Sequence, residues 1–455
     1  MSAARVAVIG GGWAGCTAAV RLARNGLATT LVEQAPALGG RARRVDLDGT
    51  AVDNGQHLLI GAYAGTLRAI AAVHDDPAPL FVRLPLTLLP FGTQPAAVAL
   101  RARQAPAPFH LALALLAARG LTTRARLQLA ARLWAEARRG FRVEPDRSVA
   151  AHYADLPRGA VDGILAPLCV AALNTLPEDA SAAVFGRVLA ATFAGPRASD
   201  FLIPATDLGS LYPDAASRAL VAAGGRCLAG TRARIVGSRC ADVTVDLAGA
   251  AEHFAAVVIA VGPHQLAAVF DDSRPVPEGC RHSLDLVAGL RYEPITTVYL
   301  DFERAPGAGA PISRLDDAPG QWLFDHTALH SATGSPRAAR WAVVISAQGT
   351  HERLAQDALV AAVEAQLRRL RPGLPPVLWA RAITEKRATY ACTPGLRRPV
   401  AGRVGAGLYL AGDYTDGEFP ATLEAATRSG EAAAQSLLAD LATAARRGDA
   451  RGYAP

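Results

Sequence analysis

Lysine, closely paired cysteines and long apolar runs are nearly absent from this sequence. Lys386 is the single lysine among 47 basic residues, a compositional bias toward arginine that carries no functional signal. The 6 cysteines include no Cys-x-x-Cys pair, so we expect reduced thiols and no cysteine-based redox or metal site. No apolar run reaches 18 residues and no leader precedes the first apolar segment, which argues against a transmembrane helix and a signal peptide. We therefore expect a cytoplasmic protein without a bound metal.

The positive charge is concentrated in one stretch, residues 95–142. This stretch holds 9 arginines and a single acidic residue, Glu136, so its net charge of +8 exceeds the +7 of the whole chain. Large apolar side chains are interleaved with the arginines: Phe109, Leu111, Leu113, Leu115, Leu116, Leu121, Leu127, Leu129, Leu133 and Trp134. A basic, leucine-rich helical segment is typical of a helix that lies on a membrane surface, and the alternative is a solvated helical cap. No nucleic-acid-binding motif is present, so we expect no nucleic acid partner.

A glycine-rich segment opens the chain, where residues 5–15 read RVAVIGGGWAG. The apolar β-branched run predicts a buried parallel strand, and the glycines that follow fit the pattern G-x-G-x-x-G. The first glycine allows a tight turn, the second lets a pyrophosphate approach the backbone, and the third lets the next helix pack closely. The N-terminus of that helix would face the phosphates. The residues expected to bind them are Gly10, Gly12, Trp13, Ala14 and Gly15.

Glu33 follows a second predicted strand, Thr29–Val32. A carboxylate at this point can accept both hydrogen bonds of an adenosine ribose, and it disfavours a 2′-phosphate. Gly39, Gly40 and Arg41 come next; the glycines permit close backbone approach, and the guanidinium can donate to phosphate oxygens. This continuation favours FAD over NAD. Because the chain has only one G-x-G-x-x-G, we expect the reducing equivalents to come from an unknown electron donor by another route.

Further elements can be predicted from turn residues and apolar periodicity. The run Asp48-Gly49 lies between two short alternating segments and predicts a primed-turn hairpin. A strand near the C-terminus ends at Gly412-Asp413, and proline is favoured in the first turn of a helix. The expected elements are a hairpin over 44–53, a helix over Leu211–Ala223, strands over Cys227–Val236 and Ala255–Gly262, and a helix beginning near Pro420.

These motifs resemble those of the flavin amine oxidase and phytoene desaturase superfamily. The matching segments are GGGWAG (10–15), Glu33, GGRAR (39–43) and AGDYTDGEFPATLEAA (411–426). More narrowly, the chain resembles the squalene-associated FAD-dependent desaturases, which are described as hydroxysqualene dehydroxylases. That match rests on DNGQHLLIGAY (53–63), PLCVAALNTLPEDASAAVFGRVL (167–189), ASDFLIPATDLGSLYPDAA (198–216) and EKRATYACTP (385–394).

The resemblance implies a set of FAD-binding residues beyond the glycine turn. Glu33 would bind the adenosine ribose, and the backbone of Ala233 would contact adenine. The C-terminal helix would direct its N-terminus at the flavin pyrimidine, where reduced flavin carries negative charge. The full set adds Gly40 and Arg41 along the phosphates, Gly55, Gln56 and His57 beside the flavin, Gly412 and Asp413 at the ribityl-pyrophosphate region, and Leu423 in that helix.

The implied fold class is α/β. It consists of a discontinuous, Rossmann-like FAD-binding domain of the glutathione-reductase type and an inserted α+β substrate domain. We expect residues 1–80, 207–270 and 396–445 to form the FAD-binding domain. Residues 81–206, mainly helical, and residues 271–395, with strands that floor a cavity, would form the substrate domain.

The resemblance also implies a reaction, the reductive removal of the allylic hydroxyl of hydroxysqualene to give squalene in squalene and hopanoid biosynthesis. The substrate would be a long apolar isoprenoid, and the enzyme would lie on the inner face of the cell membrane as a peripheral protein. A proton donor is needed, and the main candidates are His57, Asp53 and Glu424, with Asp200 and Asp413 also considered. Asp413 is better explained as a cofactor ligand and Asp53 as a cap of the following turn.

Other functions remain open at this point. A carotenoid or polyprenyl desaturase would use the same flavin in the oxidative direction. A flavin amine oxidase fits the motifs, but the basic apolar stretch suits a lipid better. A prenyl-binding escort protein could share the fold without flavin, although retention of both the glycine turn and Gly412-Asp413 argues against it.

Overall fold

A six-stranded sheet organises the part of the chain that carries the glycine motifs. The computed structural model describes residues 4–239, 242–271, 275–331, 339–415 and 417–446. The sheet order is β10 (Arg226–Leu228), β2 (Ala28–Val32), β1 (Arg5–Ile9), β14 (Ala256–Ile259), β21 (Leu408–Leu410) and β20 (Gly402–Gly405). The neighbouring strands run parallel except β20, which is antiparallel to β21. Strands from three distant segments of the chain therefore meet in one sheet.

Both faces of this sheet are covered, as the unbroken apolar run of β1 predicts. Val6 and Val8 pack with the helices α1 (Trp13–Arg24), α11 (Pro213–Ala222) and α15 (Leu423–Arg446). Ala7 and Ile9 point to the opposite face, where a small antiparallel sheet covers them. That sheet consists of β11 (Ala233–Arg239), β12 (Asp242–Leu247) and β13 (Ala250–Phe254). The alternation follows from the two-residue period of a strand and gives the expected glutathione-reductase-type layers.

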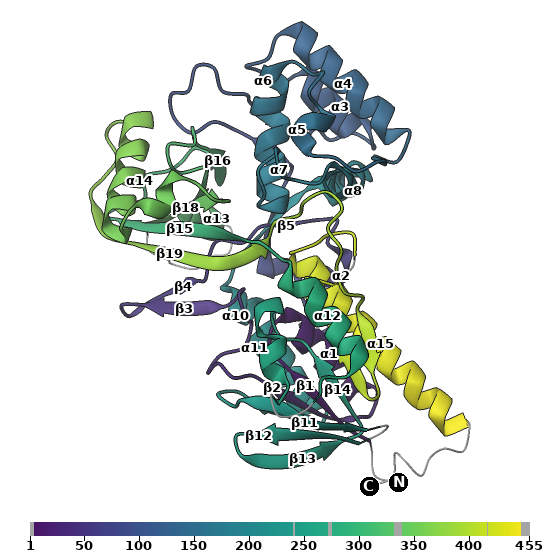
Figure 1. Cartoon of the computed structure of the whole chain (residues 1–455). Coiled ribbons are helices and arrows are strands. Elements are labelled where there is room, and N and C mark those ends of the chain that lie inside the picture. Colours follow the sequence, from purple (N-terminus) through teal and green to yellow (C-terminus); the bar gives the residue numbers. More distant parts are fainter. Residues whose placement is uncertain (1–3, 240–241, 272–274, 332–338, 416, 447–455) are drawn as a thin grey trace.

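A second sheet projects from the side of the molecule (Figure 1). Its order is β16 (Ile312–Arg314), β17 (Trp322–Asp325), β18 (Ala339–Ser346), β15 (Tyr292–Phe302) and β19 (Val377–Tyr390). Helix α14 (Gln356–Leu370) covers one face, where its Val363 and Leu367 pack against Val298 and Trp341. The long strand β19 runs back from this sheet to the cofactor side, where Tyr390 contacts Asp413.

The helices at the opposite end from the six-stranded sheet come from residues 109–199 (Figure 1). They are α3 (Phe109–Leu116), α4 (Thr123–Ala137), α5 (Val149–His152), α6 (Arg158–Ala160), α7 (Ala166–Leu173), α8 (Ala182–Phe193) and α9 (Pro196–Ser199). The side chains of Thr122, Ser148 and Ser181 cap three of them by accepting from a backbone N–H. Buried Glu136 joins α4 to α5, since it accepts hydrogen bonds from His152 and Tyr153.

Short elements connect these parts. The predicted hairpin is confirmed, because β3 (Arg44–Leu47) pairs with β4 (Thr50–Asp53), and Asp48 and Gly49 have positive φ angles of 55° and 79°. The remaining short strands are β5 (Leu59–Ile60), β6 (Phe81–Leu84), β7 (Thr87–Leu88), β8 (Leu100–Arg101) and β9 (Phe201–Pro204). The remaining helices are α2 (Ala64–Ala71), α10 (Leu208–Leu211), α12 (Glu278–Ala288) and α13 (His326–Ser331).

Two predicted elements between residues 207 and 240 were wrong in their extent. The helix expected over Leu211–Ala223 is α11, which begins at Pro213 because Tyr212, with φ −144° and ψ −58°, separates it from α10. The strand expected over Cys227–Val236 is two strands. The chain turns at Gly230, whose φ is +70°, so β10 joins the six-stranded sheet and β11 the small antiparallel one.

The start of the C-terminal helix was also predicted wrongly. The helix α15 begins at Leu423 rather than near Pro420. Ala421 has a φ of +58°, which is incompatible with a right-handed helix. The hydroxyl of Thr422 instead accepts a hydrogen bond from the backbone N–H of Ala425 at 3.1 Å and caps the helix.

The described residues contain no cluster of three or more histidine, cysteine or acidic side chains placed to bind a metal. The 5 described cysteines are free thiols, buried except for the half-buried Cys227, and Cys240 lies outside the described residues. No described helix combines the length and apolarity needed to cross a bilayer.

Candidate functional site

The turn between β1 and α1 explains why glycine occupies three of its positions. A side-chain carbon added to Gly10 would lie 2.6 Å from the carbonyl oxygen of Ala260, and one added to Gly15 would lie 1.8 Å from that of Gly10. These two glycines are therefore required by packing within the protein. Gly12 differs, because no protein atom lies within 4 Å of its added carbon. The open space at Gly12 is where a pyrophosphate would approach the backbone.

The carboxylate of Glu33 is held in place by backbone amides at the end of β2. It accepts hydrogen bonds from the N–H of Gly11 at 2.7 Å and of Ala35 at 2.8 Å, one on each oxygen. The start of the small sheet lies beside it, because the N–H of Thr231 donates to the Glu33 carbonyl at 2.9 Å and Ala233 opens β11 two residues later. Each carboxylate oxygen keeps a lone pair for a ribose hydroxyl.

The second glycine pair folds directly against this turn. The N–H of Gly39 donates to the carbonyl of Gly11 at 2.8 Å, and an added carbon at Gly40 would lie 3.4 Å from Gly12. The indole N–H of buried Trp13 donates to the carbonyl of Ala42 at 3.0 Å. The two motifs thus form one backbone surface around the open space at Gly12.

Arg41 joins the N-terminal motifs to the C-terminal one. Its guanidinium pairs with the carboxylate of Asp413 and donates to the carbonyl of Ala388 at 2.8 Å. Burial opposes the charged form, but the Asp413 carboxylate outweighs burial and raises the pKa of Arg41. Asn54 continues the network, because its amide donates to the carbonyl of Arg41 at 2.9 Å.

The segment after Asn54 turns toward the second sheet. Gly55 has a φ of +94°, a conformation that favours glycine. The N–H of Gln56 donates to the hydroxyl of Thr297 at 3.1 Å, and its side-chain oxygen lies 2.6 Å from Nε2 of His326. An amide oxygen only accepts, so His326 donates this hydrogen bond. The residues predicted to line the flavin are therefore braced by β15 and by the start of α13.

His57 keeps one ring nitrogen available. Its Nδ1 lies 2.9 Å from the carbonyl of Gly55, which can only accept, so Nδ1 carries the proton. Among the described residues, none makes a hydrogen bond to its Nε2. Burial lowers the pKa of His57, and the nearby charge of Arg41 lowers it further. The neutral form of this side chain is therefore favoured.

The other acidic candidates make hydrogen bonds or ion pairs within the protein. Asp53 accepts from the N–H of Leu208 at 2.8 Å, at the start of α10. Both oxygens of buried Glu424 accept from backbone amides at the start of α2, those of Gly65 at 2.9 Å and Thr66 at 2.8 Å. Asp200 is paired with Arg83 at 3.1 Å.

The C-terminal motif brings its own glycine constraint. A carbon added to Gly412 would lie 2.3 Å from the ring of Tyr414, so only glycine fits under this tyrosine. The N–H of Gly412 donates to the hydroxyl of Ser429 at 2.9 Å, which anchors the motif to α15. Leu423 is the first residue of that helix. The hydroxyl of Tyr414 is fully buried and has no hydrogen-bond partner among the described residues.

Three observations fit a bound dinucleotide at this site. The backbone at Gly12 faces open space between two glycine motifs, and a carboxylate oriented for a ribose lies at the end of the next strand. The orphaned hydroxyl of Tyr414 beside Asp413 marks a polar contact that a ligand can supply. These features agree with the residues predicted to hold FAD, whose individual roles stay predictions.

The structure adds residues that the motifs did not indicate. Thr297 and His326 contact the Gln56 segment, and the hydroxyl of Tyr390 donates to the carbonyl of Asp413 at 3.1 Å. His264 packs edge-on against Tyr292, where burial and then the charges of Arg387 and Arg41 lower its pKa. Tyr390 lies within the matching segment EKRATYACTP but carried no predicted role, and the other three lie outside the matching segments, so only tertiary structure reveals these contacts.

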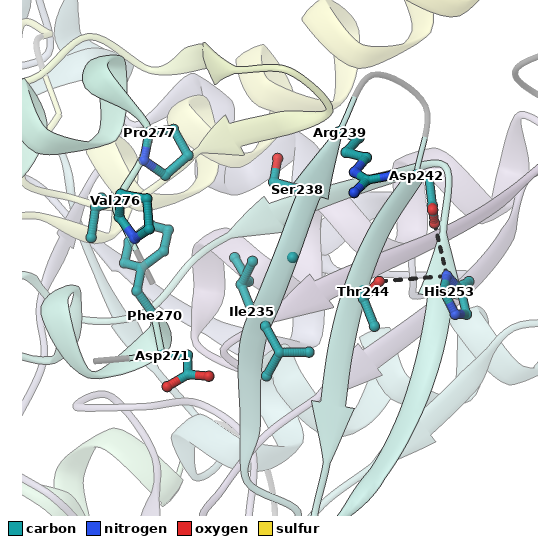
Figure 2. Close-up of a pocket in the computed structure, with 13 residues that line it drawn as sticks. Ile235, Ser238, Arg239, Asp242, Thr244, His253, Phe270, Asp271, Val276 and Pro277 are labelled. Atoms are coloured by element: carbon teal, nitrogen blue, oxygen red, sulfur yellow. Dashed lines mark hydrogen bonds and ion pairs between the residues drawn. The ribbon is translucent and has the colours of Figure 1, made fainter. Parts of the chain in front are cut away.

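A separate pocket of about 450 Å³ lies at the far end of β11 (Figure 2). Ile235, Phe270 and Pro277 line it together with His253 and Asp242, which share a hydrogen bond of 2.8 Å. None of the residues predicted to hold the cofactor lines this pocket, so it is distinct from the candidate site.

Comparison with known proteins identifies the group to which this site belongs. The model of the flavin-containing amine oxidoreductase family matches residues 13–438. A curated hydroxysqualene dehydroxylase from Rhodopseudomonas palustris is 29% identical over 95% of this chain and 98% of its own length. A second protein with that name, from Sinorhizobium fredii, is 27% identical over 96% and 99%. The crystal structure of an oxidoreductase from Methanosarcina mazei has the same fold, with a TM-score of 0.71 and 15% identity over 96% of this chain and 100% of its own.

Proposed function

We propose that this chain, which belongs to the flavin-containing amine oxidoreductase family and is an FAD-dependent oxidoreductase, converts hydroxysqualene to squalene. One observation carries the proposal: two curated hydroxysqualene dehydroxylases match it over 95% and 96% of its length. The match includes the helical insert as well as the cofactor motifs, so it extends to the part that would contact a substrate. The structure supports the cofactor half of the proposal through the geometry around Gly12, Glu33 and Asp413.

The reaction balances with one reduced flavin and one proton. When bound, the anionic reduced flavin would supply a hydride to the allylic carbon, and the hydroxyl would leave as water after accepting a proton. The protein must therefore hold the flavin, exclude water from the reacting carbon and bring a proton to the leaving oxygen.

The flavin would be held by both ends of the chain. Gly10–Gly15 and Arg41 would contact the pyrophosphate, Glu33 the ribose, and Gly412-Asp413 the ribityl side. The N-terminus of α15 would stabilise negative charge on reduced flavin, an effect of about 0.3–1 kcal/mol at an exposed helix end. Capping by Thr422 holds that terminus in position.

We assign the proton transfer to His57. Asp53 and Glu424 already accept hydrogen bonds from helix N-termini, whereas Nε2 of His57 makes no hydrogen bond to a described residue. Because burial lowers the pKa of His57 below the usual histidine value of about 6.5, only a small fraction is protonated at neutral pH. The rate of dehydroxylation should therefore rise as the pH falls through and below that value.

A pH profile of kcat/KM tests this role. His57→Gln keeps a polar side chain without a titrating ring, so it should remove the rise at low pH and lower the rate at its optimum by about 100-fold. Asp53→Asn and Glu424→Gln should keep the shape of the profile. An unchanged profile in His57→Gln would assign the proton to another group.

The partners and location of the protein form part of the same proposal. The substrate is a long apolar isoprenoid, and the basic, apolar segment 95–142 supports work at the inner face of the cell membrane, in the cytoplasm. The electron donor would be a separate reductant, since the chain has a single G-x-G-x-x-G.

A direct assay tests the reaction. Purified protein reconstituted with FAD, reduced by dithionite without oxygen and mixed with hydroxysqualene in detergent should yield squalene in proportion to the flavin. Gly12→Ala, expected to lose flavin, serves as the negative control. Absence of squalene from a fully flavin-loaded enzyme would reject the proposal. Introduction of double bonds by the oxidised enzyme into a carotenoid or polyprenyl precursor would establish the desaturase instead.

A further inference from the structure

Exposed apolar side chains gather on two helices of the insert, α3 and α4. Across the described residues, 10 large apolar side chains are exposed, and 5 of these lie on this helix pair. They are Phe109, Leu113, Leu116, Leu127 and Trp134, with exposures of 44–55%. The rings of Phe109 and Trp134 lie 6.4 Å apart, so the two helices share one continuous patch. We name these 5 side chains the apolar patch.

The spacing of the patch shows that each helix has two apolar faces. On α4 one face is buried through Ala125, Leu129 and Leu133, which packs the helix onto the insert. The patch residues Leu127 and Trp134 are seven residues apart and form a second stripe on the outside. A helix needs one apolar stripe to pack onto its own protein. The second stripe therefore requires another explanation.

Arginines extend this outer stripe. On α4, Arg124 and Arg138 follow the three- and four-residue spacing of Leu127 and Trp134, so they lie at the two ends of the same stripe. On the other side of the patch, the N–H of Arg103 donates to the carbonyl of His110 in α3 at 3.1 Å. Long arginine side chains beside an apolar stripe can reach a charged surface while their stems cover the apolar edge.

These arginines are not neutralised by the protein. Arg101, Arg103, Arg119, Arg124, Arg138, Arg139 and Arg142 are exposed, and none forms an ion pair with a described residue. Two others in the segment are engaged: Arg126 donates to the carbonyl of Leu116 at 2.8 Å, and Arg132 pairs with Glu136 and Asp155. The segment that carries the patch therefore has uncompensated positive charge, which is complementary to an anionic surface.

The loop that leaves α4 leads toward the cofactor side. Gly140 and Phe141 line a cavity of about 520 Å³ together with Phe419, which lies four residues before α15. Trp134 precedes Gly140 by only six residues, so the patch ends close to this cavity along the chain.

We propose that the apolar patch and the exposed arginines around it form a docking surface that inserts into an anionic lipid bilayer. The proposal rests on the proposed function only for the origin of the substrate, because hydroxysqualene is apolar enough to reside in the bilayer. The bilayer contact itself follows from a double-faced helix pair, an interhelical aromatic contact and uncompensated arginines. Association would be reversible and dependent on salt.

Vesicle sedimentation tests both components of the surface. The wild-type protein should sediment with vesicles of phosphatidylcholine and phosphatidylglycerol, and much less with phosphatidylcholine alone. Removing four arginines should lower the partition coefficient by about tenfold or more, and raised salt should do the same. The arginine variant is Arg101→Ser, Arg103→Ser, Arg124→Ser and Arg138→Ser, with Arg68→Ser, Arg218→Ser, Arg304→Ser and Arg353→Ser as its matched control.

A second variant removes the apolar component. Leu113→Ser, Leu127→Ser and Trp134→Ser together should reduce binding by about tenfold while leaving the arginines in place. The matched control replaces three exposed apolar side chains elsewhere, Val221→Ser, Leu354→Ser and Leu378→Ser. Equal binding of the patch variant and its control would overturn the proposal.

Tryptophan fluorescence reports insertion directly. Trp134 is the one exposed tryptophan among the 5 in the chain, since Trp13, Trp322 and Trp341 are buried and Trp379 is half-buried. Brominated lipids should quench the wild-type protein, and Trp134→Phe should bind equally but lose the quenching. Persistence of the quenching in Trp134→Phe would contradict insertion of this surface.

Two further outcomes are informative. A dimer that dissociates in the patch variant, without vesicle binding by the wild type, would make the surface an interface between copies and would overturn the proposal. Squalene formation in detergent micelles is measured separately on each variant and should not change. Squalene formation in micelles by a wild-type protein that does not bind vesicles would contradict this proposal alone. Vesicle binding without squalene formation would contradict the proposed function alone.

Discussion

The glycine turn of residues 10–15 and the helix pair α3–α4 place opposite demands on their side chains. In the turn, a single added carbon would approach a backbone oxygen to 1.8 Å at Gly15. On the helix pair, large side chains such as Leu127 extend outward, 55% exposed. Gly10 and Gly15 therefore tolerate no larger residue, whereas many apolar and basic residues would satisfy the helix pair.

This difference explains why the predicted pyrophosphate site is recognisable in the sequence as a motif. The proposed lipid-binding surface is recognisable only from the overall composition of its segment. A pyrophosphate is bound by backbone, which glycine alone exposes, so the sequence is fixed position by position. A lipid surface is bound by the sum of apolar area and charge, so no position is individually required. We expect single substitutions to abolish the first function and only multiple substitutions to abolish the second.

The largest expected effect is in the turn itself. Gly15→Ala should cost about 2 kcal/mol or more of stability and abolish flavin binding, because the backbone must move to admit the new carbon. Gly12→Ala should keep the melting temperature of the apoprotein but lose flavin, because the added carbon would meet no protein atom and would enter the space proposed for the pyrophosphate. Gly195→Ala, which also has no atom within 4 Å, should change neither. Thermal unfolding and the flavin absorbance of the purified proteins check all three, and normal flavin content in Gly12→Ala would break the comparison.

A smaller effect is expected one strand away. Glu33→Gln replaces one carboxylate oxygen by an NH₂ group that cannot accept, so the hydrogen bond that this oxygen would accept from a ribose hydroxyl is lost, together with the one from Gly11 or Ala35. A hydrogen bond to a charged group contributes about 1.5–3 kcal/mol, which corresponds to an increase of about 10- to 150-fold in the dissociation constant for FAD. Fluorescence titration of apoprotein with FAD measures this, with exposed Gln34→Ala as the control. Equal affinities of the two variants for FAD would show that Glu33 does not contribute to FAD binding.

A pH effect should distinguish the inner from the outer face of α3. Burial lowers the pKa of His110, which is fully buried in that helix. As the pH falls through about 6.5, the unfolded chain binds a proton that the folded chain does not, so stability falls. His110→Phe should lose less stability than the wild type between neutral and mildly acidic pH, a difference on the order of 1 °C in melting temperature.

The control for this prediction is His282→Gln, which changes an exposed histidine. It should show the same pH dependence as the wild type. A His110→Phe variant with an unchanged slope would show that His110 does not contribute to acid sensitivity.

The smallest effect is expected on the outer face. Leu113→Ser and Leu127→Ser should each change the free energy of unfolding by about 0.5 kcal/mol or less, as is usual for exposed positions. Urea denaturation checks this. A large destabilisation would mean that the apolar patch packs against the protein. The helix pair would then resemble the glycine turn in depending on internal packing.

The elements that the sequence predicted well are those governed by backbone chemistry. The β1 turn, the position of Glu33 and the hairpin at Asp48-Gly49 follow from glycine patterns and strand periodicity, and the structure contains all of them. The errors fall where a local signal competed with a stronger one. Pro420 suggested a helix start, but the positive φ of Ala421 and the cap of Thr422 move it to Leu423.

Contacts between distant segments were beyond prediction. The pair Arg41–Asp413 could be guessed only because both lie in cofactor motifs, whereas Thr297 and His326 lie in no motif and meet Gln56 through tertiary packing. The carboxylate of Glu424 accepts a hydrogen bond from the start of α2, and this contact depends on how α2 and α15 pack against each other. The charge of residues 95–142 was evident from the sequence, but the second apolar face of α4 required burial to be known.

The pairing of Arg41 with Asp413 has a consequence for biosynthesis. The two residues are 372 positions apart, so a ribosome adding about 5–20 residues per second needs roughly 20–75 s between them. During that interval β1 and α1 exist without β21 and α15, and the apolar face of α1 that Gly430 later approaches is uncovered. The nascent chain therefore has the glycine turn early, but the Arg41–Asp413 pair that joins it to the C-terminal motif forms only when synthesis is nearly complete.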